Sequence, residues 1–305
     1  MSIFEVTGAL LPIFGLVLLG ASLRRFGFPE DSFWPQADRL TYFVLFPALI
    51  IDNLANTRLN QPELLPLTLI LVISILCIST LTFIFSILFK TPATVFTSVL
   101  QGSIRPNTYV GLAGAASLYG TEGVALTTVA IASVVPLVNV ISVTAFVQMI
   151  PQRRSGIKAV LMGILKNPLI VGCLLGLFLS VSQWGLSGTP KEMMAMLSKA
   201  SLPLGLISVG AALRIQTLGN WFALSKSSIF KLILSPMLVW GLCMYFGVEG
   251  MPRGVAILYA ALPCSVSSYT LSAQMGGDKN LVAGIITVQT LLAMLSIPWI
   301  LGSFA

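Results

Sequence analysis

The chain has 305 residues, of which 56% are hydrophobic and only 9% are charged, and it contains no histidine. Soluble domains carry roughly 25% charged residues, so a surface this poor in charge must face lipid. The net charge of +7 does not indicate nucleic acid binding, because the basic residues stand singly between apolar runs. Basic residues of this kind collect in the cytoplasmic loops of membrane proteins. The composition therefore predicts an integral membrane protein and excludes His-based catalysis.

Ten apolar runs follow one another along the chain, and a membrane-spanning helix needs roughly 20 such residues. The first run is not preceded by Lys or Arg and shows no small-residue cleavage site, so it does not have the features of a secretory signal. We therefore expect it to be retained as the first helix. The expected spans lie near residues 3–23, 39–56, 64–89, 93–118, 122–149, 159–182, 191–213, 222–247, 253–275 and 280–302. The predicted fold class is an all-α membrane protein with ten transmembrane helices.

The distribution of Lys and Arg predicts the orientation of the chain. With the N-terminus outside, most of the 17 basic residues fall on the cytoplasmic side, as the positive-inside rule requires. The residues then assigned to cytoplasmic loops are Arg24, Arg25, Arg39, Lys90, Arg153, Arg154, Lys158, Arg214, Lys226 and Lys279. Those assigned to external loops are Arg58, Lys191, Lys199 and Arg253. Both termini are therefore predicted to lie on the external side of the membrane.

Proline and glycine positions repeat along the chain at a nearly constant distance. Separations of 156 or 157 residues relate Pro12 to Pro168, Pro47 to Pro203, Pro106 to Pro263 and Gly120 to Gly277. Because each unit holds five helices, an odd number, the second unit must lie upside down relative to the first. Inverted repeats of this kind are typical of secondary transporters.

The repeat predicts the domain organisation. Residues 1–150 form the first five-helix repeat and residues 159–305 the second, inverted one. Between them, residues 151–158 form a basic cytoplasmic connector.

Proline interrupts the fourth and ninth spans at matching positions. Pro106, beside Arg105, and Pro263 each remove a backbone hydrogen bond in mid-span, and the freed backbone groups need partners in lipid. A charge at the bilayer centre costs about 2.5–3.5 kcal/mol on insertion scales, which argues for a function of Arg105. Paired broken helices indicate a binding site near the bilayer midplane, where the N-termini of half-helices face an anionic group.

The candidate substrate-binding residues surround these two prolines. They are Arg105, Pro106, Asn107, Thr108, Pro263, Cys264, Ser265, Ser267 and Ser268. Possible coupling or supporting residues are Asp52, Asn53 and Gln289. Structural alternatives stay open: Arg105 could reach an interface or pair structurally, Asn107 could cap the second half-helix, and the serines could hydrogen-bond between helices.

Several segments resemble one known family. The segment Arg105-Pro106-Asn107-Thr108-Tyr109-Val110-Gly111-Leu112 is similar to the helix 4 motif of the bacterial auxin efflux carrier family, whose members are related to plant PIN-type carriers. Residues 166–170 resemble the start of that family's helix 6, and residues 202–206 with 210–213 resemble its helix 7. Helix 9 and the start of helix 10, with residues 274–278, complete the resemblance. The resemblance therefore covers the whole chain.

The resemblance implies a fold like that of the bile acid symporters, in which helices 4 and 9 unwind and cross at the membrane centre. Helices 1, 2, 6 and 7 would form a scaffold, and helices 3, 4, 5, 8, 9 and 10 an elevator-type transport domain. The implied substrates are small organic anions such as auxin-like carboxylates, malate or malonate. Asn107 matches the family's crossover asparagine, whereas Ser267 stands where bacterial relatives often carry a second asparagine. A bacterial inner-membrane location and a homodimer are also implied.

Three other functions compete with a carrier. A channel lacks support because no ring of charges or filter segment is evident. A membrane-embedded enzyme lacks paired carboxylates in a span, and the four cysteines show no metal-site or disulfide spacing. A sensor or scaffold with a transporter-like body remains open. No cofactor is expected, and coupling stays open between a proton, a sodium ion and uniport.

Overall fold

The computed structural model describes residues 1–55, 62–150, 167–182, 184–214 and 219–305. Every regular element in these ranges is a helix. Among the described residues, Pro106 and Cys264 also form an isolated antiparallel β-bridge. The predicted connector at 151–158 lies outside the described ranges, so its prediction is not tested.

The first part of the chain folds as a series of helices that follow the predicted spans. They are α1 (Ile3–Arg25), α2 (Phe33–Leu40), the π-helix η1 (Thr41–Leu45), α3 (Phe46–Ala55), α4 (Leu64–Leu88), α5 (Ala93–Ile104) and α6 (Thr108–Met149). The helices α2, η1 and α3 follow one another without a gap and cover the second predicted span. Within α6, Gly120 has φ 63° and ψ −150°, which an L side chain rarely adopts. This bend marks the predicted boundary between the fourth and fifth spans.

The second part of the chain is built in the same way. Its helices are α8 (Pro168–Val181), α9 (Gly188–Ala211), α10 (Trp221–Ile229), the π-helix η3 (Phe230–Leu234), α11 (Ser235–Phe246), α12 (Gly250–Ala261), α13 (Ser267–Met275) and α14 (Lys279–Phe304). Helical residues occupy every predicted span within the described ranges. Six helices there are long and apolar enough to cross a membrane, and α5 and α8 are shorter apolar helices.

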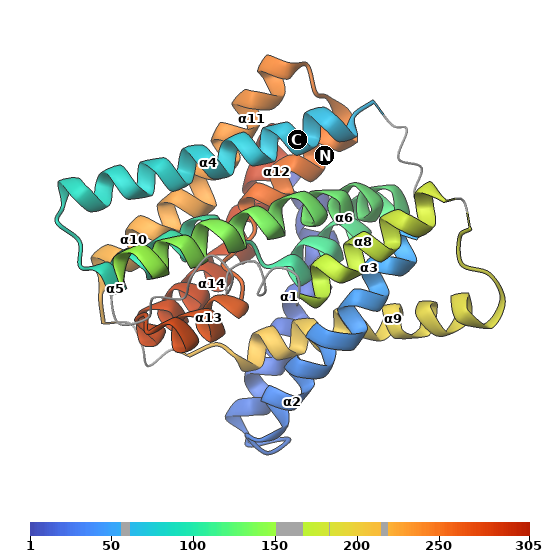
Figure 1. Ribbon diagram of the computed structural model, residues 1–305, viewed down its shortest axis with the longest axis horizontal. Coiled ribbons are helices and arrows are strands. Elements are labelled where there is room, and N and C mark those ends of the chain that lie inside the picture. The colour runs from blue at the N-terminus through green and yellow to red at the C-terminus, as the bar shows by residue number, and fades with distance from the viewer. Residues whose placement is uncertain (56–61, 151–166, 183, 215–218) are drawn as a thin grey trace.

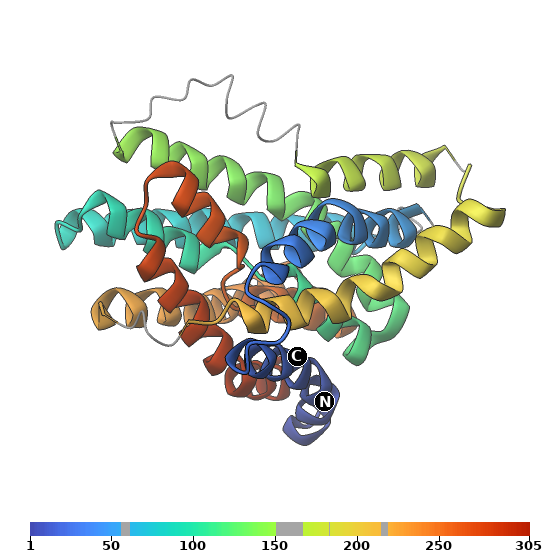
Figure 2. The ribbon, with the colours of Figure 1, turned by 90° about the horizontal axis from the view of Figure 1, so that it is seen from below.

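The helices pack as two neighbouring groups, which α6 and a contact between α1 and α14 join. One group contains α1, α3, α8 and α9, in which α1 packs on α9 and α3 packs on both α8 and α9. In Figure 1, α3, α8 and α9 lie on the right, and α5, α10, α13 and α14 lie on the left. The turned view in Figure 2 shows that α1 lies beside α14, where the two groups also meet. Because α6 contacts α4, α5 and α12 as well as α1, α3, α8 and α9, it links the groups.

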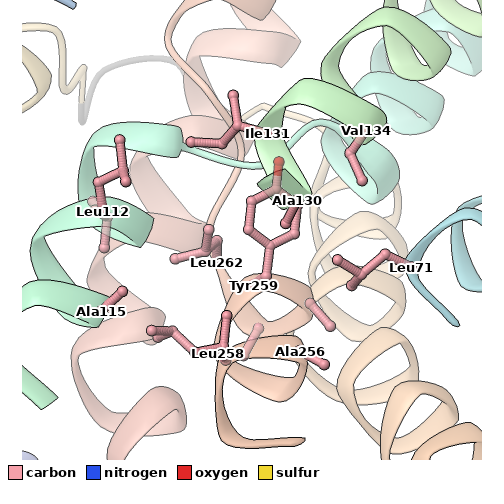
Figure 3. Close-up of a cluster of buried hydrophobic side chains, with 14 of the residues drawn as sticks. Leu71, Leu112, Ala115, Ala130, Ile131, Val134, Ala256, Leu258, Tyr259 and Leu262 are labelled. Carbon is pink, nitrogen blue, oxygen red and sulfur yellow. The ribbon is translucent and has the colours of Figure 1, made fainter. Parts of the chain in front are cut away.

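A dry apolar cluster forms where α4, α6 and α12 meet. Figure 3 shows Leu71, Ile131 and Tyr259 from these three helices packed together, and all three side chains are buried. By contrast, large apolar side chains such as Leu295 of α14 are exposed, in this case to 77%. A lipid environment removes the penalty that such exposure would carry in water.

Glycines bring α1 and α9 into backbone contact. A Cβ atom at Gly20 of α1 would overlap the carbonyl oxygen of Ile207, and one at Gly210 of α9 would overlap the carbonyl oxygen of Val17. Small residues permit such close approach, which drives helix association in membranes through packing. The contact between α1 and α9 therefore depends on the absence of side chains at both glycines.

We expect Gly20→Ala to destabilise the protein, because the added methyl group must push α1 and α9 apart. Overpacking of a close interface costs about 1–3 kcal/mol, which should lower the melting temperature of the purified protein by several degrees. Gly15→Ala is the matched control, because nothing lies within 4 Å of a Cβ atom at Gly15 in the same helix. Equal melting temperatures for the two variants would contradict the backbone contact.

Candidate functional site

The two proline-interrupted spans are broken where the sequence predicts, and the unwound segments hydrogen-bond to each other. The first break separates α5 from α6, and the second separates α12 from α13. The backbone N–H of Asn107 donates to the Pro263 carbonyl at 2.8 Å, and the N–H of Ser265 donates to the Arg105 carbonyl at 3.0 Å. Each break therefore supplies partners for backbone groups that the other leaves unpaired in the helix.

Gln289 of α14 joins both breaks through its side-chain amide. Its Oε1 atom accepts from the backbone N–H of Cys264 at 2.9 Å, and its Nε2 atom donates to the carbonyl of Gly102 at 3.1 Å. Nε2 also lies 3.1 Å from Oγ of Ser227 in α10. Gln289 is fully buried, with 0% exposure. An apolar side chain at this position would leave backbone groups of both breaks without partners.

Arg105 is held by neutral partners beside the breaks. Its Nε atom donates to Ser267 Oγ at 3.1 Å, and its Nη2 atom donates to Asn139 Oδ1 at 2.7 Å. The third nitrogen, Nη1, is buried and has no hydrogen-bond partner. All ten acidic residues of the chain lie in the described ranges, and none forms an ion pair with Arg105. The guanidinium thus retains one buried donor for a further acceptor.

A cavity of about 50 Å³ lies in front of Arg105. Besides Arg105, four predicted site residues line this cavity: Pro106, Thr108, Ser265 and Ser267. The remaining lining residues are Asp38, Tyr42, Phe46, Tyr109, Val135, Val138, Asn139, Asn167, Leu169 and Val266. Residues of both breaks therefore line the cavity, together with residues of α2, η1, α3, α8 and the second half of α6.

The other predicted site residues near the breaks are buried and do not line the cavity. Asn107 caps α6, where its Oδ1 atom accepts from Val110 N–H at 3.4 Å, and its buried Nδ2 atom has no partner. The Cys264 thiol donates to Ser268 Oγ at 3.3 Å. The Pro263 carbonyl is occupied by Asn107 N–H. These residues therefore hold the two breaks together through hydrogen bonds and do not line the cavity.

Asp52 and Asn53 lie farther along α3 and do not line this cavity. Both are half-buried, and Asn53 Nδ2 donates to the Leu49 carbonyl at 2.7 Å. Instead, the half-buried carboxyl group of Asp38 in α2 lines the cavity. The coupling role predicted for Asp52 stays a prediction.

Sequence reasoning missed four polar residues of the cavity wall: Asp38, Tyr42, Asn139 and Asn167. The Tyr42 hydroxyl donates to Asn167 Oδ1 at 3.3 Å, which ties η1 to the start of α8. Asn139 is a polar residue inside an apolar run, and this signal could have identified it. Asp38 stands at the start of a span, where an acidic residue is usually wetted, so no signal was available for it.

A second cavity, of about 220 Å³, adjoins the first. Asp38 and Val266 line both cavities. Arg24 and Arg214 also line the second cavity; Arg24 Nε lies 3.3 Å from Asp31 Oδ1, and the guanidinium of Arg214 stacks 5.5 Å from the ring centre of Tyr269. In the described ranges, no group of three acidic or cysteine side chains is placed to hold a metal ion.

Comparison with known proteins identifies the family. The family model described as membrane transport protein matches residues 5–301. The chain belongs to this family. It is the auxin efflux carrier family, so the resemblance drawn from the helix 4 motif is confirmed. As a member of the membrane transport protein family, the chain is a multi-pass membrane transporter and not an enzyme.

Two archaeal relatives agree with this assignment. The chain is 23% identical over 300 residues to an uncharacterized transporter of Methanocaldococcus jannaschii, an alignment that covers 94% of this chain and 96% of the relative. It is 29% identical over 117 residues to an uncharacterized transporter of Methanothermobacter thermautotrophicus, covering 38% of this chain and 39% of the relative.

We expect Gln289→Leu to destabilise the transporter, because the change leaves the Cys264 N–H and the Gly102 carbonyl buried without partners. Each unpaired buried group costs about 1–3 kcal/mol, so the melting temperature should fall clearly. The same substitution at the exposed Gln36 of α2 provides the control and should change the melting temperature little. A Gln289→Leu variant as stable as Gln36→Leu would show that other groups satisfy the breaks.

Proposed function

We propose that this transporter moves a small organic anion whose carboxylate binds Arg105 in the cavity beside the two breaks. The observation that carries the proposal is the buried Nη1 donor of Arg105, which has neither a hydrogen-bond partner nor an acidic neighbour in ion-pair contact. Leaving a buried charged group unsatisfied is costly, whereas a carboxylate would accept a charge-assisted hydrogen bond from it. The proposed substrates are auxin-like carboxylates or dicarboxylates such as malate or malonate.

Helix orientation supports the same assignment. Both α6 and α13 begin at the breaks, and a helix N-terminus carries about half a positive charge that favours an anion. Thr108, the first residue of α6, and Ser267, the first residue of α13, both line the cavity. An anion in the cavity would therefore meet two helix N-termini as well as Arg105.

Cavity size favours a small substrate group. The volume of about 50 Å³ has room for only a few water molecules, since one needs roughly 10–15 Å³ on this measure. A carboxylate group is of comparable size. The adjoining cavity of about 220 Å³ offers space for the remainder of the substrate.

Contacts between the halves support two inverted five-helix repeats. Gly20 of α1 contacts Ile207 of α9, and Gly176 of α8 contacts Ile51 of α3. Adding 156 to Gly20 and Ile51 gives Gly176 and Ile207, so each contact maps onto the other when the halves are exchanged. Such exchange is expected for repeats related by a two-fold axis in the membrane plane.

The proposed mechanism is elevator-type alternating access. The ten predicted spans would form a scaffold from α1, α2–α3, α8 and α9 and a transport domain from the other helices, with the breaks crossing at mid-membrane. In the predicted orientation, Arg24 and Arg214 are cytoplasmic, so the second cavity would lead from the cytoplasm to the site. The external termini, the bacterial inner membrane and the homodimer remain part of this proposal.

Uptake and binding by purified variants test the proposed site. We expect Arg105→Ala to weaken carboxylate binding by about one to two decades, since a buried charged hydrogen bond contributes roughly 1.5–3 kcal/mol. Arg105→Lys should weaken it less, because Lys keeps the charge but not the planar donor geometry. Asn107→Ala should abolish uptake with nearly normal expression, because it removes the side chain that caps α6 at the first break. Uptake into proteoliposomes and ligand-induced thermal shifts with mono- and dicarboxylates provide the measurements.

Controls separate the proposed function from its alternatives. Asn280→Ala, an exposed change at the start of α14, should leave uptake and binding unchanged. Saturable uptake that responds to counter-substrate supports a carrier, whereas non-saturating flux would indicate a channel. Binding without uptake would indicate a sensor. Wild-type affinity in Arg105→Ala would remove Arg105 from the site.

Two acidic residues compete for a coupling role. We expect Asp38→Asn to remove any pH dependence of uptake, because Asp38 lines both cavities and an amide cannot titrate. Asp52→Asn is the matched comparison, since Asp52 is also half-buried but lines neither cavity. Uptake should be measured from pH 5 to pH 8. Loss of the pH dependence in Asp52→Asn alone would assign coupling to Asp52 instead.

A further inference from the structure

A buried lysine lies close to the breaks but outside the proposed substrate cavity. Lys231 belongs to the π-helix η3 and is only 3% exposed. This π-helix packs against α5, α12 and α14, the helices that carry the breaks and Gln289. Lys231 lines neither cavity. Its ammonium group therefore has a role other than direct contact with a substrate in the cavity.

No acidic side chain compensates the charge of Lys231. All ten Asp and Glu residues lie in the described ranges, and none forms an ion pair with it. Lys231 also has no hydrogen bond to any described residue. A lysine without such a partner is rare in a protein interior. Something other than a carboxylate must compensate this charge.

The helix that carries Lys231 packs against both breaks. The π-helix η3 contacts α5 and α12, and Cys264 of the second break bridges to Pro106 of the first. Ser227, one helical turn before Lys231, contacts Gly102 of α5 and accepts from Gln289 Nε2 at 3.1 Å. The face of this helix that carries Lys231 is therefore turned toward the end of α5 and the second break.

Helix polarity gives that region a negative charge. Both α5 and α12 end at the breaks, and a helix C-terminus carries about half a negative charge. The positive ends of α6 and α13 lie at the cavity, which Thr108 and Ser267 line and Lys231 does not. The two negative ends together carry roughly one charge, which one ammonium group offsets. In transporters with broken helices, half-helix C-termini and unwound carbonyls commonly coordinate a coupling cation.

We propose that Lys231 is a built-in cation that neutralises the carboxyl ends of α5 and α12, so that this transporter works without bound Na⁺ or K⁺. The proposal rests on the proposed function in one respect: Arg105 is left to the substrate anion because Lys231 already balances the helix ends. Lys231→Met removes the charge with little change in side-chain length and opens space for a small cation.

Melting temperatures in different chloride salts at equal ionic strength test the proposal without a substrate. The wild-type melting temperature should be the same in sodium, potassium and choline chloride. Lys231→Met should melt several degrees lower in choline chloride and recover part of that loss in sodium or potassium chloride. Lys231→Arg, which keeps the charge, should respond as the wild type does.

Lys226→Met, in α10 directly before η3, is the matched control. The Lys226 ammonium lies 5.3 Å from the ring centre of Phe85 and 5.7 Å from that of Phe89, and Lys226 is only half-buried. Its loss should not make the melting temperature respond to sodium or potassium.

In proteoliposomes, carboxylate uptake by the wild type should be unchanged in choline medium. Lys231→Met should be slower there by roughly tenfold or more, a factor equivalent to about 1.4 kcal/mol.

Two results would overturn the proposal. One is a wild-type protein whose melting temperature or uptake rises with sodium or potassium at constant ionic strength. The other is a Lys231→Met variant that behaves as the wild type does. If Lys231→Met does not fold, the melting temperatures of the wild type and of Lys231→Arg in the three chloride salts still test the proposal. A wild type that transports no carboxylate but shows the expected melting pattern contradicts the proposed function and leaves the role of Lys231 intact.

Discussion

The structure depends on the mutual satisfaction of two broken backbones. Pro106 and Pro263 carry no N–H group, and unpaired backbone groups are expensive in lipid. Neither break would be stable alone in lipid, because its freed backbone groups would lack partners. Side by side, they exchange the hydrogen bonds from Asn107 to Pro263 and from Ser265 to Arg105. Gln289 pairs with further backbone groups of both breaks. The site therefore exists only when the two halves of the chain are packed together.

That arrangement also distributes charge. The positive ends of α6 and α13 and the negative ends of α5 and α12 all meet at the breaks. Arg105 lines the cavity, and Lys231 does not. Two cations without acidic partners are stable only if something else offsets them. In the proposed mechanism the helix ends offset Lys231, and the substrate anion offsets Arg105. Substrate binding would then relieve an electrostatic cost that the empty protein carries.

Much of the fold was predictable because lipid imposes simple rules on sequence. Apolar length located the helices, and the matched prolines located both breaks, since proline acts locally on the backbone. The cavity wall was harder to predict. Asp38, Tyr42 and Asn167 come from other spans, and only tertiary packing brings them to Arg105. Helices that are apolar all round give no periodic signal for the face that turns inward. The family resemblance gave the protein class, which the comparisons confirm.

Contacts within one helix group differ in kind from a contact between the two groups, and this difference bears on the proposed movement. Within the group of α1, α3, α8 and α9, Gly20 and Gly210 put α1 and α9 in backbone contact, which fixes their spacing. Between the groups, Tyr109 of α6 packs its ring against Phe46 of α3, with ring centres 4.6 Å apart, and covers Gly205 of α9. Side chains can change rotamer, whereas interlocked backbones cannot slide. In the proposed elevator movement, the Tyr109 contact next to the cavity would have to change, and so would the close approach of Gly302 in α14 to Ile3 in α1.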